Sequence, residues 1–110
     1  MSIKSQRIAN DMKIAISEII RDEVNDPDVK FITITSIHLS DDKSYAKVYF
    51  TSLVDDEKKE TEKALNHASG HVKAELGHRM NFRKSPTLKF VYDESIEYGK
   101  HIEDIISKLD

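Results

Sequence analysis

Apolar residues in the first quarter of the chain recur at intervals of three and four positions, which is the spacing of one face of an α-helix. Five residues define this face: Ile8, Met12, Ile16, Ile19 and Ile20. Ser5 can cap the start of the helix with its hydroxyl group, and the pattern continues to about Val24. Because the residue before a proline is pushed out of the helical conformation, the helix ends at Asn25-Asp26-Pro27.

A run of β-branched residues over positions 31–39 predicts the first strand. Its apolar residues change parity along the way: Ile32, Ile34, Ile37 and Leu39. Successive side chains of a strand alternate between its two faces, so a strand with one buried face must shift phase within this run. We therefore predict a β-bulge or a strong local twist near Ser36.

The second predicted strand covers residues 45–53 and alternates regularly. One face carries Ala46, Val48 and Phe50, and the opposite face carries Tyr45, Lys47, Tyr49 and Thr51. The link between the two strands is the short turn Ser40-Asp41-Asp42-Lys43, whose acids are ordinary turn residues. A link of this length predicts an antiparallel hairpin.

A long helical pattern begins at Asp55 or Asp56 and runs to about Asn81. Its apolar stripe contains Leu65, Ala68, Val72, Leu76 and Met80. Ser69-Gly70 interrupts the stripe, and such pairs are a known cause of helix kinks. A straight helix of about 26 residues would measure about 39 Å, against about 30 Å for the strands. We predict a bend at Ser69-Gly70; the alternative is a tolerated glycine in a straight helix.

A third strand over residues 87–92 and a last helix starting at Ser95 complete the pattern. The apolar stripe of this helix contains Ile102, Ile105, Ile106 and Leu109. The order is α-β-β-α-β-α. It predicts a single α+β domain over residues 1–110, with a three-stranded sheet and helices packed on one face.

Composition narrows the class of protein. The chain has no cysteine, no apolar run of about 20 residues and no signal-peptide core at its N-terminus, so we expect a cytoplasmic protein without a membrane segment. The net charge is −3, but residues 71–90 are basic with Glu75 as their single acid, whereas residues 93–110 are mostly acidic. Such asymmetry often marks a binding face, although both segments could simply be solvated surface.

The chemistry-bearing residues favour binding over catalysis. His67, His71 and His78 would share one side of a straight helix and could bind zinc in a small metal-dependent enzyme, but the predicted bend would separate them. The chain has neither a cysteine nucleophile nor a glycine-rich phosphate loop. We expect no enzyme, no metal and no cofactor. A further alternative is a protein-interaction adaptor that uses the acidic last helix.

Cations cluster around and after the predicted bend, namely Lys73, Arg79, Arg83 and Lys84. Together with backbone amides freed near Gly70, they could bind RNA phosphates. The competing interpretation is that the last three merely complement the C-terminal end of the helix dipole. A weaker candidate surface is the outer face of the sheet, with Lys47, Tyr49 and Lys89, where tyrosine and lysine are also common without a function.

Several strings of this chain occur in the same order and at matching spacing in one family. They are Asp26-Pro27, Ile32-Thr-Ile-Thr-Ser-Ile-His-Leu-Ser40, Ala46-Lys-Val-Tyr49, Ala68-Ser69-Gly70 and Arg83-Lys-Ser-Pro-Thr-Leu-Lys-Phe90, followed by Asp93, Ser95 and Gly99. This combination resembles the ribosome-binding factor A family over nearly the whole chain.

The resemblance implies a type II KH-like fold in which an Ala-x-Gly kink, here Ala68-Ser69-Gly70, replaces the usual Gly-x-x-Gly loop. It also implies binding to the precursor or free small (30S) ribosomal subunit and its 16S rRNA, with other assembly factors as further candidate partners. We expect the protein to be a monomer. Late subunit maturation, rRNA processing and cold adaptation are the implied roles. The family often has arginine where this chain has Asp28, so Lys30 becomes a candidate RNA contact.

Overall fold

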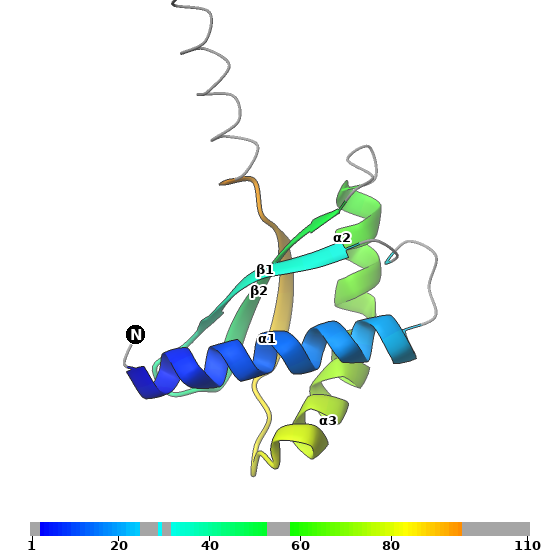
Figure 1. The fold of residues 1–110 in the computed structure, drawn as a ribbon. Helices are drawn as coiled ribbons and strands as arrows, with labels where there is room; N and C mark the ends of the chain where they lie inside the picture. Colours follow the sequence, from blue (N-terminus) through cyan, green and yellow to red (C-terminus); the bar gives the residue numbers. More distant parts are fainter. Residues whose placement is uncertain (1–2, 25–28, 30–31, 53–57, 96–110) are drawn as a thin grey trace, which may run out of the picture.

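The structure is a computed structural model of the chain, and it describes residues 3–24, 29, 32–52 and 58–95. Its elements are α1 (Ile3–Glu23), β1 (Ile32–Leu39), β2 (Tyr45–Ser52), α2 (Lys58–His67), α3 (Ser69–Met80) and β3 (Thr87–Tyr92) (Figure 1). The predicted caps Asp55 and Asp56, the residue Lys30 and the helix predicted beyond Ser95 lie outside the described residues.

The first helix begins earlier than the sequence pattern indicated. We predicted Ser5 as its cap, but α1 already includes Ile3, so Ser5 lies within the first turn and that prediction was wrong. Helix ends are the boundaries that periodicity defines least, because the apolar stripe starts only at Ile8. The other end agrees with the prediction, since α1 stops at Glu23, shortly before Pro27.

The three strands form one sheet in the order β1-β2-β3. The hairpin prediction is confirmed, because β1 and β2 pair in antiparallel fashion. β3 covers the predicted residues 87–92 and pairs with β2 in parallel, a pairing that requires a crossover connection. α2 and α3 supply that connection, so both helices are built into the topology of the sheet.

The β-bulge predicted in the first strand is confirmed. Ile34 pairs with Phe50, but the next pair is Ser36 with Tyr49, which leaves Thr35 as the extra residue. The shift turns Ile34 and Ile37 to the same buried side. It also aims the Thr35 hydroxyl group, which donates a hydrogen bond of 2.7 Å to the Asp93 carboxylate, just after β3.

The hairpin turn is organised by Asp42. Its carboxylate accepts hydrogen bonds from the hydroxyl group and the amide of Ser44 and from the hydroxyl group of Ser40. These bonds stabilise the ionised form and lower the pKa of Asp42 to about 2. The following residue, Lys43, adopts a positive φ of 59° to close the turn. Asp42 therefore has a structural explanation in this turn.

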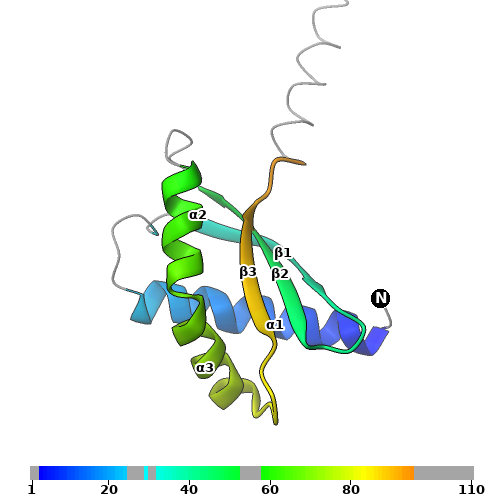
Figure 2. The ribbon, with the colours of Figure 1, turned by 180° about the vertical axis from the view of Figure 1, so that it is seen from behind.

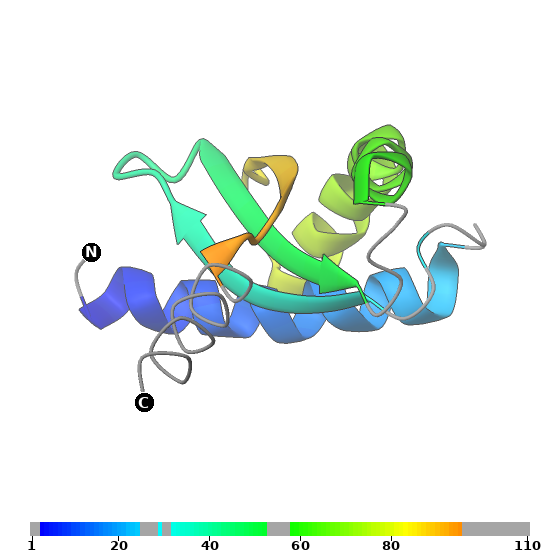
Figure 3. The same cartoon turned by 90° about the horizontal axis from the view of Figure 1, so that it is seen from above.

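One face of the sheet forms the core together with the helices. Alternate residues of β2 and β3 are buried there, and the rings of Phe50 and Tyr92 meet edge to face with centroids 5.6 Å apart. Figure 2 shows α1 on the far side of the strands and α2 and α3 beside β3, while Figure 3 shows α2 nearly end-on above α1. The helices contribute the buried residues Met12, Ile16, Ile19, Leu65, Val72 and Leu76. The predicted α+β class, with helices on one face, is confirmed.

Candidate nucleic-acid interface

The long helical pattern is divided into α2 and α3 by a break at Ala68, which has φ −84° and ψ −3°. The predicted bend is confirmed, but it lies one residue before Ser69-Gly70. Both backbone groups of Ala68 remain bonded: its amide donates to the carbonyls of Ala64 and Leu65, each at 3.1 Å, and its carbonyl accepts from Val72 at 3.1 Å. The helix therefore changes direction without losing the hydrogen bonds of the residue at the break.

Ser69, rather than Gly70, gives the break its local cause. The Ser69 hydroxyl group donates to the carbonyl of Asn66 at 2.7 Å, and such a bond from a side chain to an earlier carbonyl commonly bends a helix. Gly70 does not have a positive φ, and a Cβ built on it would meet no atom within 4 Å. The glycine is therefore not required by the fold, and it leaves an open position on the surface of α3.

On one side of the break, polar side chains fix α2 to β3. The Asn66 amide group both donates to the Phe90 carbonyl at 3.0 Å and accepts from the Phe90 amide at 2.9 Å. The Glu62 carboxylate accepts from the Tyr92 amide at 3.0 Å. Because β3 is an edge strand, these bonds satisfy backbone groups that would otherwise be open to another chain.

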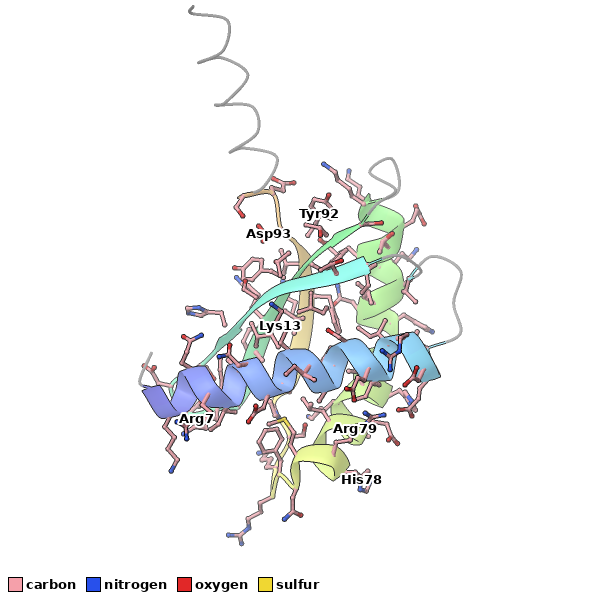
Figure 4. The ribbon with its side chains drawn as sticks, in the orientation of Figure 1. Arg7, Lys13, His78, Arg79, Tyr92 and Asp93 are labelled. Atoms are coloured by element: carbon pink, nitrogen blue, oxygen red, sulfur yellow. The ribbon has the colours of Figure 1, made fainter. Side chains whose placement is uncertain are left out.

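On the other side of the break, ion pairs fix α3 to α1. The Arg79 guanidinium lies 3.0 Å from Glu18 and 3.1 Å from Glu23, and the His71 ring lies 3.5 Å from Glu23. Figure 4 shows Arg79 between α3 and α1. The sequence pattern predicted Arg79 as an RNA contact. In the structure its charge is engaged by two carboxylates, with about a third of the side chain (34%) exposed.

A shallow open groove of about 410 Å³ runs along α3 and the loop that follows it. Its lining residues are Gly70, Lys73, Ala74, Gly77, His78, Asn81, Phe82 and Ser85. Two of the predicted RNA-binding residues, Gly70 and Lys73, therefore lie in it. The ammonium group of Lys73 is 3.4 Å from the Thr87 hydroxyl group, a long contact that leaves the lysine available at the rim.

The loop can approach α3 closely because Gly77 has no side chain. A Cβ on Gly77 would lie 3.3 Å from the Cβ of Ser85, and the Ser85 hydroxyl group donates to the Lys73 carbonyl at 2.9 Å. The helix ends with Asn81 in the left-handed conformation, at φ 55° and ψ 41°. These contacts build one wall of the groove from the residues that follow the helix.

Arg83 and Lys84 are exposed in this loop, directly after Phe82, which lines the groove. Neither side chain has a hydrogen bond or an ion pair with another residue in the described part of the chain. Their position after α3 also suits the negative end of the helix dipole. The structure thus brings Gly70, Lys73, Arg83 and Lys84 to one region, whereas Arg79 faces α1.

Several residues of the groove were not predicted from the sequence, most clearly Ala74 and Gly77. A signal was present, because Gly70, Ala74 and Gly77 are four and then three residues apart and so share one face of a helix. His78, a candidate metal ligand from the sequence, lines the groove.

The weaker candidates Lys47, Tyr49 and Lys89 lie on the face of the sheet that points away from the helices. Their neighbours along each strand are buried, whereas Lys89 is exposed and the other two are half-buried. This surface lies on the other side of the sheet from α3, and Lys73 of the groove reaches its edge at Thr87.

The residues that the structure describes contain neither a metal-binding cluster nor a membrane-spanning helix. No group of three or more histidine, aspartate or glutamate side chains there is arranged to hold a metal ion, and His71 is instead paired with Glu23. Within the same ranges, no helix has the length and apolar character needed to cross a bilayer.

The element order, the mixed three-stranded sheet and the break between α2 and α3 define a type II KH-like domain. The family model of ribosome-binding factor A matches residues 4–106 of the chain. The chain belongs to the ribosome-binding factor A family.

Curated relatives and solved structures agree with this assignment. The chain is 48% identical over 109 residues to ribosome-binding factor A of Staphylococcus epidermidis, covering 98% of this chain and 94% of the relative. It is 43% identical over 110 residues to that of Macrococcus caseolyticus, covering 99% and 96%.

Among solved structures, the crystal structure of ribosome-binding factor A from Thermus thermophilus is similar with a TM-score of 0.72 and 28% identity, over 78% of this chain and 92% of that one. A homology model of the T. thermophilus protein, fitted into the cryo-EM map of its complex with the 30S subunit, gives a TM-score of 0.69 and 27% identity. That match covers 82% of this chain and 96% of the other.

Proposed function

We propose that this chain is a noncatalytic assembly factor that binds the precursor or free small ribosomal subunit through its 16S rRNA. Membership of the ribosome-binding factor A family supports this function. So does the T. thermophilus relative, which is described in a complex with the 30S subunit. The proposed partner also places the protein in the cytoplasm, where ribosomes are assembled.

The proposed RNA-binding site is the groove on α3. The observation that carries it is the open position at Gly70, where nothing in the fold requires a glycine and nothing fills the space. A missing side chain lets a phosphate backbone approach the helix closely, while Lys73, Arg83 and Lys84 supply positive charge around the groove. Cations of this kind position RNA by its phosphates and by its shape more than by its base sequence.

The factor acts by binding energy alone, as a single-domain monomer without a cofactor. By preferring one conformation of the rRNA, it shifts the folding equilibrium of the subunit toward that conformation. This action supports late maturation of the subunit and processing of 16S rRNA. We expect the subunit to need this factor most at low temperature, because misfolded RNA helices then dissociate most slowly.

The test is charge reversal at the groove. Arg83→Glu with Lys84→Glu should lower cosedimentation with purified small subunits by about tenfold or more, because two phosphate contacts become repulsive. Lys59→Glu with Lys63→Glu, on the exposed side of α2, changes the net charge equally and should bind normally. Arg79 is left in place because it holds α3 to α1.

The same groove variant, as the only copy in growing cells, should accumulate precursor 16S rRNA, more strongly at low temperature. Normal cosedimentation of a correctly folded groove variant, together with normal rRNA processing, would contradict the proposed site.

A further inference from the structure

The outer face of the sheet carries a row of basic residues across all three strands. In the strand register His38 pairs with Lys47, and Lys47 pairs with Lys89. Neighbouring strands lie about 4.8 Å apart, so the three side chains are direct neighbours on one face. Lys89 and His38 are exposed, and Lys47 on the central strand is half-buried.

Nothing within the described part of the chain compensates the charges of this row. None of the three side chains has a hydrogen bond or an ion pair there. Asp93 follows β3 directly, four residues after Lys89, so their backbones are about 13 Å apart by strand spacing. Its carboxylate already accepts bonds from Thr35 and Ser95. Lys47 and Lys89 are like charges directly opposite each other, which destabilises a sheet, and no hydrogen bond or ion pair within the described residues offsets that cost.

Aromatic residues flank the row along the central strand. Tyr45 and Tyr49 lie on the same face of β2 as Lys47, one on either side of it, and Tyr45 is 39% exposed. Lysines interleaved with aromatic rings are the arrangement that binds single-stranded nucleic acid, because cations follow the phosphates while bases stack on the rings.

We propose that this outer sheet face, made of His38, Tyr45, Lys47, Tyr49 and Lys89, is a second RNA-binding surface that takes a single-stranded segment of ribosomal RNA. The choice of RNA as the partner rests on the proposed function. Apart from the tyrosines, the face carries small polar residues and one aliphatic residue, Val91, so it lacks the apolar centre that a protein partner requires. An RNA duplex is a poorer partner for this face than a single strand, because its paired bases cannot stack on the tyrosine rings.

The second surface lies on the other side of the sheet from α3 and meets the groove at one edge. α3 packs on the buried side of the sheet, while the Lys73 ammonium group reaches the hydroxyl group of Thr87, the outer-face residue paired with Tyr45, at 3.4 Å. A protein with both surfaces holds a folded region of rRNA through the groove and an unpaired strand through the sheet. That combination suits a subunit in which part of the RNA has not yet paired.

The experiment titrates the full-length protein with a short, fluorescent, single-stranded RNA of mixed sequence between about 50 and 200 mM salt. In Lys47→Gln with Lys89→Gln we expect about tenfold weaker binding and a salt slope smaller by about 1.4, because each lost single-strand phosphate contact removes about 0.7. The thermal midpoint should stay equal or rise, since the substitution relieves repulsion. Lys59→Gln with Lys63→Gln is the matched control and should change neither quantity.

Ultraviolet crosslinking of the same RNA locates the contact, and we expect crosslinks in the peptide that contains Tyr45 and Tyr49. Unchanged affinity and salt slope in Lys47→Gln with Lys89→Gln, or crosslinks confined to α3 and its loop, would overturn the inference. Loss of small-subunit association without loss of single-strand affinity would also overturn it and point to an acidic protein. Failure of the proposed function looks different, because the unaltered protein would then not cosediment with small subunits.

Discussion

Gly70 and Gly77 both face the groove, but the absence of a side chain has a different origin at each. Gly77 is required by packing, because its Cβ position lies only 3.3 Å from Ser85. Gly70 has open space around its Cβ position and an ordinary backbone conformation. Glycine inside a helix is less stable than alanine. The fold therefore gives no reason for a glycine rather than an alanine at position 70.

The two glycines should therefore respond differently to alanine. Gly70→Ala should raise the free energy of unfolding by about 0.5–1 kcal/mol and should weaken association with small subunits, because the new methyl group occupies the proposed approach of the RNA backbone. Gly77→Ala should gain less or lose stability, because Ser85 must move. Urea unfolding and cosedimentation of both variants measure these effects. Equal gains in the two variants, or undiminished subunit binding by Gly70→Ala, would contradict this assignment.

At this scale the sequence predicted the bend but not its cause. Ser69-Gly70 stood out because it interrupts an apolar stripe, and both the serine hydroxyl bond and the glycine are compatible with that pattern. The role of Gly77 depends on how the loop returns to α3, and Ser85 is eight residues further along the chain. A one-dimensional pattern carries no information about such a contact.

Among the elements, α3 depends on α1 for its position. Arg79 reaches Glu18 and Glu23, which lie 61 and 56 residues earlier in the chain. From the sequence, the residue type and the local charge indicated that Arg79 binds RNA. The carboxylates beside it become visible only when α3 packs against α1. The same limit applies to β3, whose strand was predicted but whose parallel pairing with β2 was not.

Removing the ion pairs of Arg79 should loosen α3 without unfolding the domain. Arg79→Met should cost about 1 kcal/mol of unfolding free energy, a modest value because the pairs are partly exposed to solvent. A double-mutant cycle with Glu23→Gln should give a coupling energy of about a few tenths of a kcal/mol or more. Arg83→Met, an exposed cation without a partner in the described residues, serves as the control and should change stability little. A coupling energy of zero would mean that the ion pair makes no contribution in solution.

Across the whole molecule, Asp93 connects parts of the chain that are distant in sequence. Its carboxylate accepts from Thr35, 58 residues away, and from both the amide and the hydroxyl group of Ser95. Its own amide donates to the Phe50 carbonyl at 2.7 Å, so the residue extends β3 along β2. The parity shift in the sequence predicted the bulge at Thr35, but the hydrogen-bond partner of Thr35 follows only from the sheet order.

This connection should make stability depend on acid in a specific pH range. The hydrogen bonds from Ser95 and Thr35 stabilise the ionised carboxylate and lower the pKa of Asp93 below its ordinary value of 3.8. A group whose pKa is lower in the folded state stabilises the fold above its unfolded pKa, and that contribution is lost as the pH falls through the folded pKa. The stability advantage of the unaltered protein over Asp93→Ala should therefore be constant from about pH 7 to about pH 5 and should shrink below about pH 4.

Urea unfolding across this range measures the difference between the unaltered protein and Asp93→Ala, and all other carboxylates cancel because both proteins carry them. Thr35→Val keeps the Asp93 carboxylate and removes one of its hydrogen-bond donors. Its free energy of unfolding should therefore fall short of the unaltered protein's by less than that of Asp93→Ala, and this difference should also shrink at low pH. If the advantage stays unchanged down to about pH 3, the ionised Asp93 is not what joins β1 to the end of β3.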